Sequence, residues 1–255
     1  MKPNFLLSLV FLISPLIAQD EAAPASDQPA AAAAPELMPN QKAFLNLPEE
    51  TRKEFIKHVG EASRLFQQKR IFETLEELDK AEKIFAESPE IMNLRGSCFV
   101  EMRAFDKALA EFKKASALSK DNPSINFNIA EVYFVTKEWQ KSADLFEKIL
   151  NQIPATNTAL SRLVEFKILL CKKKLGKRDE AMILAEKYDF LDDSPFYYYA
   201  KAALAYDDND LIKAEEWLAM AGRIFSDPQT VAPWQDTLVE FGYIKSFYGD
   251  DEAAE

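Results

Sequence analysis

The chain has 255 residues, of which 48% are hydrophobic and only six are glycine, and its formal net charge is −11. This length allows one large domain or two small ones, and the scarcity of glycine disfavours nucleotide-binding α/β enzymes and all-β folds. The negative charge disfavours nonspecific attraction to nucleic acid or to an anionic membrane. Abundant alanine, leucine, lysine and glutamate favour helices.

The first 18 residues, MKPNFLLSLVFLISPLIA, combine a positive charge at Lys2 with an apolar run and a small residue, Ala18. This pattern predicts a secretory signal peptide over residues 1–18, and therefore an exported protein, periplasmic or secreted. An uncleaved anchor is the alternative, but the apolar run is shorter than the ~20 residues that span a bilayer. No other segment is long and apolar enough to cross a membrane. Residues 19–41 are rich in alanine and proline, so we expect a disordered linker.

Residues 42–228 show a repeat of 34 residues. Residue pairs that match at this spacing are Pro89 and Pro123, Gly96 and Ala130, Phe105 and Trp139, and Phe112 and Phe146. Each unit has the pattern of two amphipathic helices joined by a short polar turn, and such a hairpin buries its apolar face only by stacking on its neighbours. The predicted units span about 49–88, 89–122, 123–156, 157–194 and 195–228. The fourth carries about five extra residues, which predicts a longer first helix.

The repeat resembles that of the tetratricopeptide repeat family. The residues that carry the resemblance are Gly96, Phe105, Ala108, Phe112 and Ala115 in the second unit, Ala130, Tyr133, Trp139, Phe146 and Pro154 in the third, and Ala202, Leu211, Ala214 and Ala221 in the fifth. Ser142 and Thr74 depart from it, because the family usually has alanine there. The resemblance covers most of the mature chain and implies an all-α fold, an α-solenoid of about five helix–turn–helix repeats.

The residues after the repeats predict one more helix and a tail. In residues 229–248, Trp234, Leu238 and Phe241 fall on one helical face, which predicts a C-terminal capping helix that covers the last repeat. Residues 249–255 are mostly acidic and are expected to be a disordered tail.

No set of residues in the sequence suggests catalysis or metal binding, so we expect no enzyme activity, no cofactor and no metal. His58 is the single histidine, and no nucleophile lies near it. Cys98 and Cys171 fall on the first helices of two repeats that are not adjacent, so both are expected to be reduced, buried thiols. The acidic stretch DDND lacks the spacing of a calcium loop, and Asn209 or Asp210 is expected to cap the next helix.

The family resemblance implies a concave groove lined by the first helices of the units. The expected partner-binding residues are Phe66, Phe127, Glu131, Phe134, Phe196, Tyr199 and Tyr206. The carboxylate clamp of some family members is not expected, because its positions hold Val59, Ser63, Phe127 and Glu131. Two alternatives stay open with equal weight: the aromatic side chains form an exposed binding surface, or they are buried against the protein's own helices.

These observations predict a non-enzymatic interaction scaffold of the cell envelope that binds a peptide or helix of another protein in an aromatic groove. The alternative is a structural subunit that self-associates. We expect no nucleic-acid partner. The sequence does not name the partner.

Overall fold

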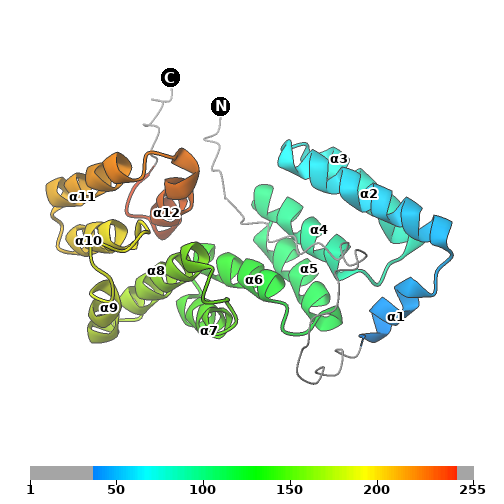
Figure 1. Cartoon of the computed structure of the whole chain (residues 1–255), viewed down its shortest axis with the longest axis horizontal. Helices are drawn as coiled ribbons and strands as arrows, with labels where there is room; N and C mark the ends of the chain where they lie inside the picture. Colours follow the sequence, from blue (N-terminus) through cyan, green and yellow to red (C-terminus); the bar gives the residue numbers. More distant parts are fainter. Residues whose placement is uncertain (1–36, 246–255) are drawn as a thin grey trace, which may run out of the picture.

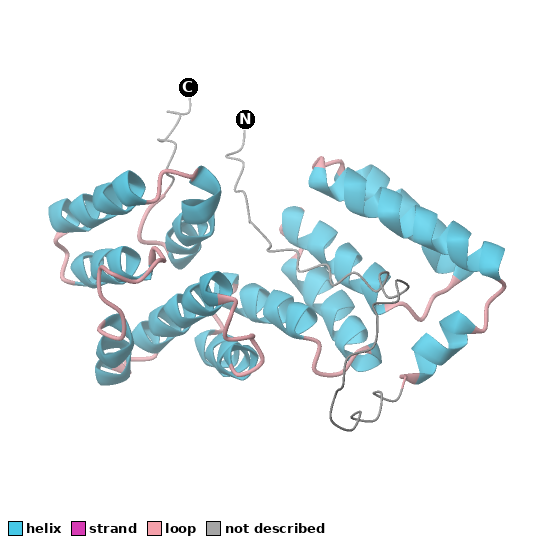
Figure 2. Cartoon of the chain, in the orientation of Figure 1, coloured by secondary structure: helices cyan, strands magenta, loops and turns pink. Residues whose placement is uncertain are grey.

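The structure, a computed structural model, describes residues 37–245, which form twelve α-helices and no strand. Figures 1 and 2 show these helices joined by short loops in a curved stack. The predicted signal peptide, residues 19–36 of the predicted linker and the predicted acidic tail lie outside the described residues.

Ten of the helices form five antiparallel hairpins that follow one another along the chain. The pairs are α2 (Glu49–Gln67) with α3 (Ile71–Ile84), α4 (Pro89–Glu101) with α5 (Phe105–Leu118), α6 (Pro123–Val135) with α7 (Trp139–Leu150), α8 (Thr158–Lys174) with α9 (Arg178–Ala185), and α10 (Phe196–Asp207) with α11 (Leu211–Ile224). Successive pairs pack on each other, so the predicted all-α solenoid of about five repeats is confirmed.

The five hairpins share one kind of turn. A residue with positive φ follows the first helix of each pair: Lys69, Arg103, Lys137, Gly176 and Asn209. The next residue then donates its N–H to a carbonyl five residues earlier, as Arg70 does to Leu65 at 3.0 Å, which ends the helix and satisfies a terminal carbonyl. The first three of these turns recur every 34 residues. The interval to the fourth is longer because α8 has 17 residues, whereas α4 and α6 have 13 each.

Small residues let the two helices of a hairpin approach closely. A Cβ atom added to Gly96 on α4 would lie 2.6 Å from Cε1 of Phe112 on α5. In the next unit Ala130 takes the same place, and the hydroxyl of Ser142 donates to its backbone carbonyl at 3.0 Å. The position therefore requires a small side chain, because the facing ring fills the space that a larger one would need.

A short helix precedes the repeats. Helix α1 (Pro39–Leu45) begins at a proline that needs no hydrogen-bond acceptor in the first turn. Its Phe44 packs against Phe55 and Phe85, with ring centroids 5.1 and 5.4 Å apart. Residues 39–41, which were predicted to belong to the disordered linker, are therefore helical.

The last helix, α12 (Pro228–Phe241), covers more than the last repeat. Its Trp234 packs on Phe196 and Tyr199 of α10 in that repeat, but most of its packing is against α6 and α8, on the inner side of the stack (Figure 1). The first helices of the third to fifth units offer more aromatic surface there than α11 offers, so the apolar face of α12 is buried across the concave side.

A candidate partner-binding groove occupied by α12

The predicted groove residues fall into two separate places. Those of the third and fifth units lie on α6 and α10, in or beside one large core cluster that also contains residues of α8 and α12. Phe66 lies apart, in the cluster that α2, α3 and α4 form. The structure thus brings six of the seven predicted residues to the part of the concave face that α12 crosses.

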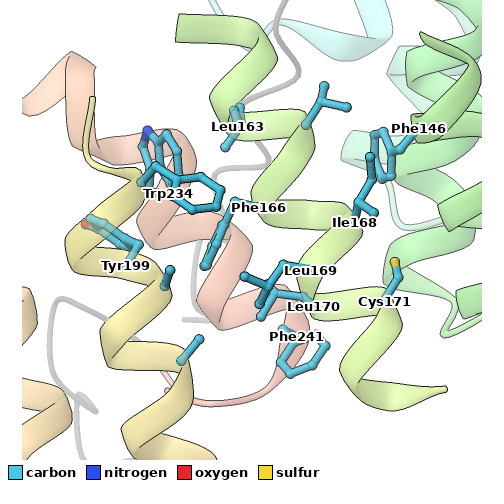
Figure 3. Packing of buried hydrophobic residues seen from close by; sticks show 14 of the residues in the cluster. Phe146, Leu163, Phe166, Ile168, Leu169, Leu170, Cys171, Tyr199, Trp234 and Phe241 are labelled. Carbon is cyan, nitrogen blue, oxygen red and sulfur yellow. The ribbon is translucent and has the colours of Figure 1, made fainter. Parts of the chain in front are cut away.

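Trp234 is the first anchor of α12. Its ring centroid lies 5.3 Å from that of Phe166 on α8, and 5.6 and 6.3 Å from those of Tyr199 and Phe196 on α10. Figure 3 shows the indole between α8 and α10, beside the rings of Phe166 and Tyr199. Phe196, Tyr199 and Trp234 are all buried. The fifth-unit part of the predicted groove is therefore filled by a side chain of the same protein.

Phe241 and Tyr243 form the second anchor. The Phe241 ring packs against Trp139 and Phe134, with centroids 5.4 and 6.1 Å apart, and the Lys174 Nζ lies 4.5 Å from its centroid. Tyr243 stacks on Tyr206 of α10 at 5.0 Å, with the ring planes 14° apart. Gly242, in the left-handed conformation, ends the helix between these two aromatic residues.

A buried charged cluster lies between the two anchors. The Lys167 Nζ of α8 is 3.0 Å from Glu131 of α6 and 3.5 Å from Glu240 of α12. The exposed fractions of these three side chains are only 4%, 8% and 7%. The Lys167 ammonium also lies 4.8 Å from the Phe134 ring centroid. One lysine therefore connects the inner helices of the third and fourth units with α12.

The cluster holds more carboxyl groups than ammonium groups. Glu131 and Glu240 share the single ammonium group of Lys167, and the nearby Asp236 of α12 acts on both of them. Burial, together with Glu131 and Asp236, raises the pKa of Glu240 to about 8 even though Lys167 lowers it. Burial likewise raises the pKa of Glu131. Burial alone would lower the pKa of Lys167, but the carboxylates of Glu131 and Glu240 raise it, so the lysine stays charged.

Oε1 of Glu131 and Oε2 of Glu240 are buried oxygens that receive no well-formed hydrogen bond from the described residues. The second lies at ion-pair distance, 3.5 Å, from the Lys167 Nζ. A buried oxygen without a donor is costly, on the order of 1–3 kcal/mol. Burial of Trp234, Leu238 and Phe241 favours docking by roughly 2 kcal/mol for each side chain. Apolar contacts therefore hold α12 in the groove, and its charged residues oppose them.

The structure decides between the two alternatives for the groove aromatics. Phe66, Phe127, Phe134, Phe196 and Tyr199 are buried, and Tyr206 is partly covered. The Phe127 ring packs at 5.7 Å against that of Phe146 in its own hairpin. In this conformation they form core and a covered groove, whereas their role in partner binding stays a prediction.

Sequence reasoning missed the residues that complete this site. Lys167 was not assigned to the groove because the fourth unit departs from the 34-residue spacing, and it lies 36 positions after its partner Glu131. Trp234 and Phe241 were recognised as one apolar face, but the surface that they cover was not. Asp236 and Glu240 are four residues apart and share one face of the helix, next to Trp234 and Phe241. This pattern could have indicated that a charged residue of the groove faces α12.

The histidine, the two cysteines and the acidic turn make structural contacts rather than a second site. His58 bonds to Glu77 at 2.7 Å on the α2–α3 surface. Cys98 and Cys171 are buried, as predicted, and burial raises the pKa of each thiol to about 12, so neither is a reactive thiolate. The side chain of Asp210 accepts a hydrogen bond from the Lys213 N–H at 3.1 Å, which confirms the predicted helix cap.

Two further findings concern the described residues alone. Residues 37–245 contain no group of three histidine, cysteine, aspartate or glutamate residues arranged to hold a metal ion. None of their helices is both long enough and apolar enough to cross a membrane.

The repeated hairpins and their concave face define a helical-repeat solenoid. The family model described as tetratricopeptide repeat matches residues 99–165. The match includes α5, α6 and α7, and hairpins with the same turn geometry and packing continue on both sides of it. No curated protein matches its sequence significantly.

Several solved structures share the fold. YrrB, described as a tetratricopeptide repeat protein with an unusual peptide-binding site, is 19% identical, with a TM-score of 0.51, and the match covers 76% of this chain and 96% of YrrB. The pilF protein of Pseudomonas aeruginosa is 16% identical, with a TM-score of 0.53 and coverage of 76% and 94%. The apo quorum sensor NprR from B. thuringiensis is 16% identical, with a TM-score of 0.57 and coverage of 79% and 61%.

Proposed function

We propose that this protein is a non-enzymatic scaffold of the cell envelope whose concave face binds a helix or peptide of a partner protein. The observation that carries the proposal is α12 itself, a helix seated on that face through Trp234 and Phe241. A surface that accommodates one amphipathic helix has the shape and the apolar lining to accept another.

The composition of the groove narrows the partner. Its lining is aromatic, and Lys167, the cation at its centre, is already paired with Glu131, so a partner helix needs aromatic or large apolar side chains. YrrB has an unusual peptide-binding site, and peptide binding by the same fold in this protein is part of the proposal.

A competition experiment tests the binding surface. The tagged chain is used to recover partners from an envelope extract, with and without an excess of a synthetic peptide that spans residues 227–245. We expect the peptide to reduce recovery of the specific partner, because the peptide and the partner bind the same aromatic surface of the groove. A peptide with the same composition and a scrambled order is the matched control. Equal recovery with both peptides would reject the concave face as the binding surface.

The envelope location has its own test. The predicted signal peptide should be removed on export, so Edman sequencing of the protein from native cells should begin at Gln19. Cell fractionation should recover the mature protein outside the cytoplasm. An intact residue 1 together with a cytoplasmic fraction would contradict the proposed location, and an intact residue 1 in the membrane fraction would favour the uncleaved anchor.

Self-association is the alternative function, and one observation favours it. Phe190 and Leu191, in the connection between α9 and α10, are 63% and 74% exposed beside Tyr197. A pair of exposed apolar side chains next to an aromatic ring is a candidate contact between copies. Light scattering after size exclusion decides: a mass that rises with concentration and falls in a Phe190→Ser/Leu191→Ser variant supports self-association, and a constant monomer mass excludes it.

A further inference from the structure

Helix α12 is built differently from the helices on which it lies. It has Pro233 in its interior, and this residue has no N–H to donate to the preceding turn, so α12 is weak as an isolated helix. Three residues, 225–227, connect it to α11, and its packing is mainly with α6 and α8. Its helical conformation therefore depends on the groove rather than on the neighbouring hairpin.

The contact between α12 and the groove contains the buried charged cluster described above. Groups from all three inner helices face the carboxyl groups of this cluster. Glu131 comes from α6 and Lys167 from α8, the Cys171 thiol of α8 faces Glu131 and Lys167, and the Tyr199 hydroxyl of α10 faces Asp236. Glu240 belongs to α12 and leaves the cluster with it, whereas Glu131 and Lys167 remain as a balanced pair.

We propose that α12 is a releasable occupant of the partner-binding groove, and that the surplus of carboxyl groups around Lys167 makes its release easier as the pH rises above neutrality. This inference rests on the proposed function, because the released groove is the one that a partner helix would enter. A helix with aromatic side chains seven residues apart, as Trp234 and Phe241 are, and with no carboxylate between them would replace α12 without the surplus charge.

The direction of the pH effect follows from Glu240. In the docked helix its pKa is about 8, compared with an ordinary value of 4.5. Between these values the docked state holds a proton that the released state does not, so docking weakens as the pH rises through this window and levels off above pH 8. The raised pKa of Glu131 acts in the same direction. Cys171, with a pKa of about 12, and Tyr199, whose pKa burial raises, do not titrate in this range.

A labelled peptide measures the release. It spans residues 227–245 and carries Asp236→Asn and Glu240→Gln, so the bound peptide lacks both carboxylates that α12 brings to the cluster. Fluorescence anisotropy gives its apparent affinity for the full chain at pH 6 and pH 9. Because the attached α12 competes for the same surface, we expect the affinity to increase about tenfold to a hundredfold at the higher pH.

Three variants of the full chain complete the design. Glu240→Gln removes the titrating group from the attached helix and should reduce the pH effect to about threefold or less. Glu216→Gln, on the exposed surface of α11, is the matched control and should retain the full effect. Trp234→Ala weakens the attached helix directly and should bind the peptide more tightly than the wild type at both pH values. Circular dichroism checks that each variant keeps its helices.

The outcomes separate the two proposals. Peptide binding to the Trp234→Ala chain, without a pH effect in the wild type, would overturn the pH-dependent release and leave the binding groove standing. A pH effect of equal size in the Glu240→Gln chain would also overturn it, because another group would then be responsible. Absence of binding to every chain, including a folded Trp234→Ala chain, would overturn both the release and the proposed function of the groove.

Discussion

The first and fifth units of the solenoid have equivalent residues in different environments. Ile56 and Val59 of α2 occupy the same repeat positions as Phe196 and Tyr199 of α10. Ile56 is 40% exposed and Val59 is half-buried, whereas Phe196 is fully buried and Tyr199 nearly so. The difference arises because α12 crosses the concave face from α6 to α10 and does not cover α2. A groove position in the repeat therefore does not by itself determine whether a side chain is open to a partner.

The two halves also differ in the probes that they contain. All three tryptophans, Trp139, Trp217 and Trp234, lie in the C-terminal half, so tryptophan fluorescence reports on that half alone. Circular dichroism reports on every helix. The two signals together show which half a substitution affects, which matters in a repeat protein because unfolding need not be all-or-none.

The largest effect is expected for Trp234→Ala. The change removes a buried ring from between α8 and α10, and truncation of a buried tryptophan costs about 3–5 kcal/mol. We expect the urea midpoint followed by tryptophan fluorescence to fall strongly. Ile56→Ala, at an open groove position of the first unit, is the control, with an expected cost below about 1 kcal/mol. Similar losses in both variants would contradict the contrast between the two halves.

The close approach in the second unit should give opposite effects at two glycines. Gly96→Ala places a Cβ 2.6 Å from the buried ring of Phe112 and should destabilise the protein by about 1–3 kcal/mol. Gly60→Ala, in α2, meets no atom within 4 Å and should stabilise the protein by about 0.5–1 kcal/mol. Urea unfolding followed by circular dichroism measures both, and the early part of the transition should shift. If Gly96→Ala left the midpoint unchanged, the helices would be able to separate at no cost.

Raising the pH should weaken the C-terminal half alone. Glu240 has a raised pKa of about 8 in the folded protein. The stability that its protonated form gives the fold is therefore present in full below its ordinary pKa of 4.5 and is lost as the pH rises to about 8. The expected loss between pH 6 and pH 9 is on the order of 2 kcal/mol. It should appear in the fluorescence-detected transition and be absent from a Glu240→Gln variant. An equal loss in that variant would assign the effect to other groups.

The smallest effects are expected at helix caps. Asp227 accepts a hydrogen bond from the Gln229 N–H at 3.0 Å at the start of α12, and Ser88 accepts one from the Ile91 N–H at 3.3 Å at the start of α4. Replacement of either by alanine should cost about 1 kcal/mol. Asp227→Ala should shift the fluorescence transition, and Ser88→Ala should shift only the circular dichroism signal. A reversed assignment would show that the two halves unfold as one unit.

The hairpins could be predicted from the sequence because their determinants are close together along the chain. Gly96 faces Phe112 within one unit, and the turn at Asn209 and Asp210 is set by four or five neighbouring residues. The extra length of the fourth unit could also be predicted from the sequence, because it interrupts the 34-residue spacing. The groove at Lys167 could not be predicted in the same way, because that side chain contacts one residue 36 positions earlier and another on the last helix.

The sequence by itself determined the repeat, its period, the turns and caps, and the amphipathic face of the last helix, because each depends on interactions within a helix or between adjacent helices. Only the tertiary structure decided where that face is buried. An apolar stripe formed by Trp234, Leu238 and Phe241 is compatible with any apolar surface, since the hydrophobic effect has no direction. The aromatic rings of α8 and α10 and the charge of Lys167 select the concave face, and these groups come together only when the solenoid has formed.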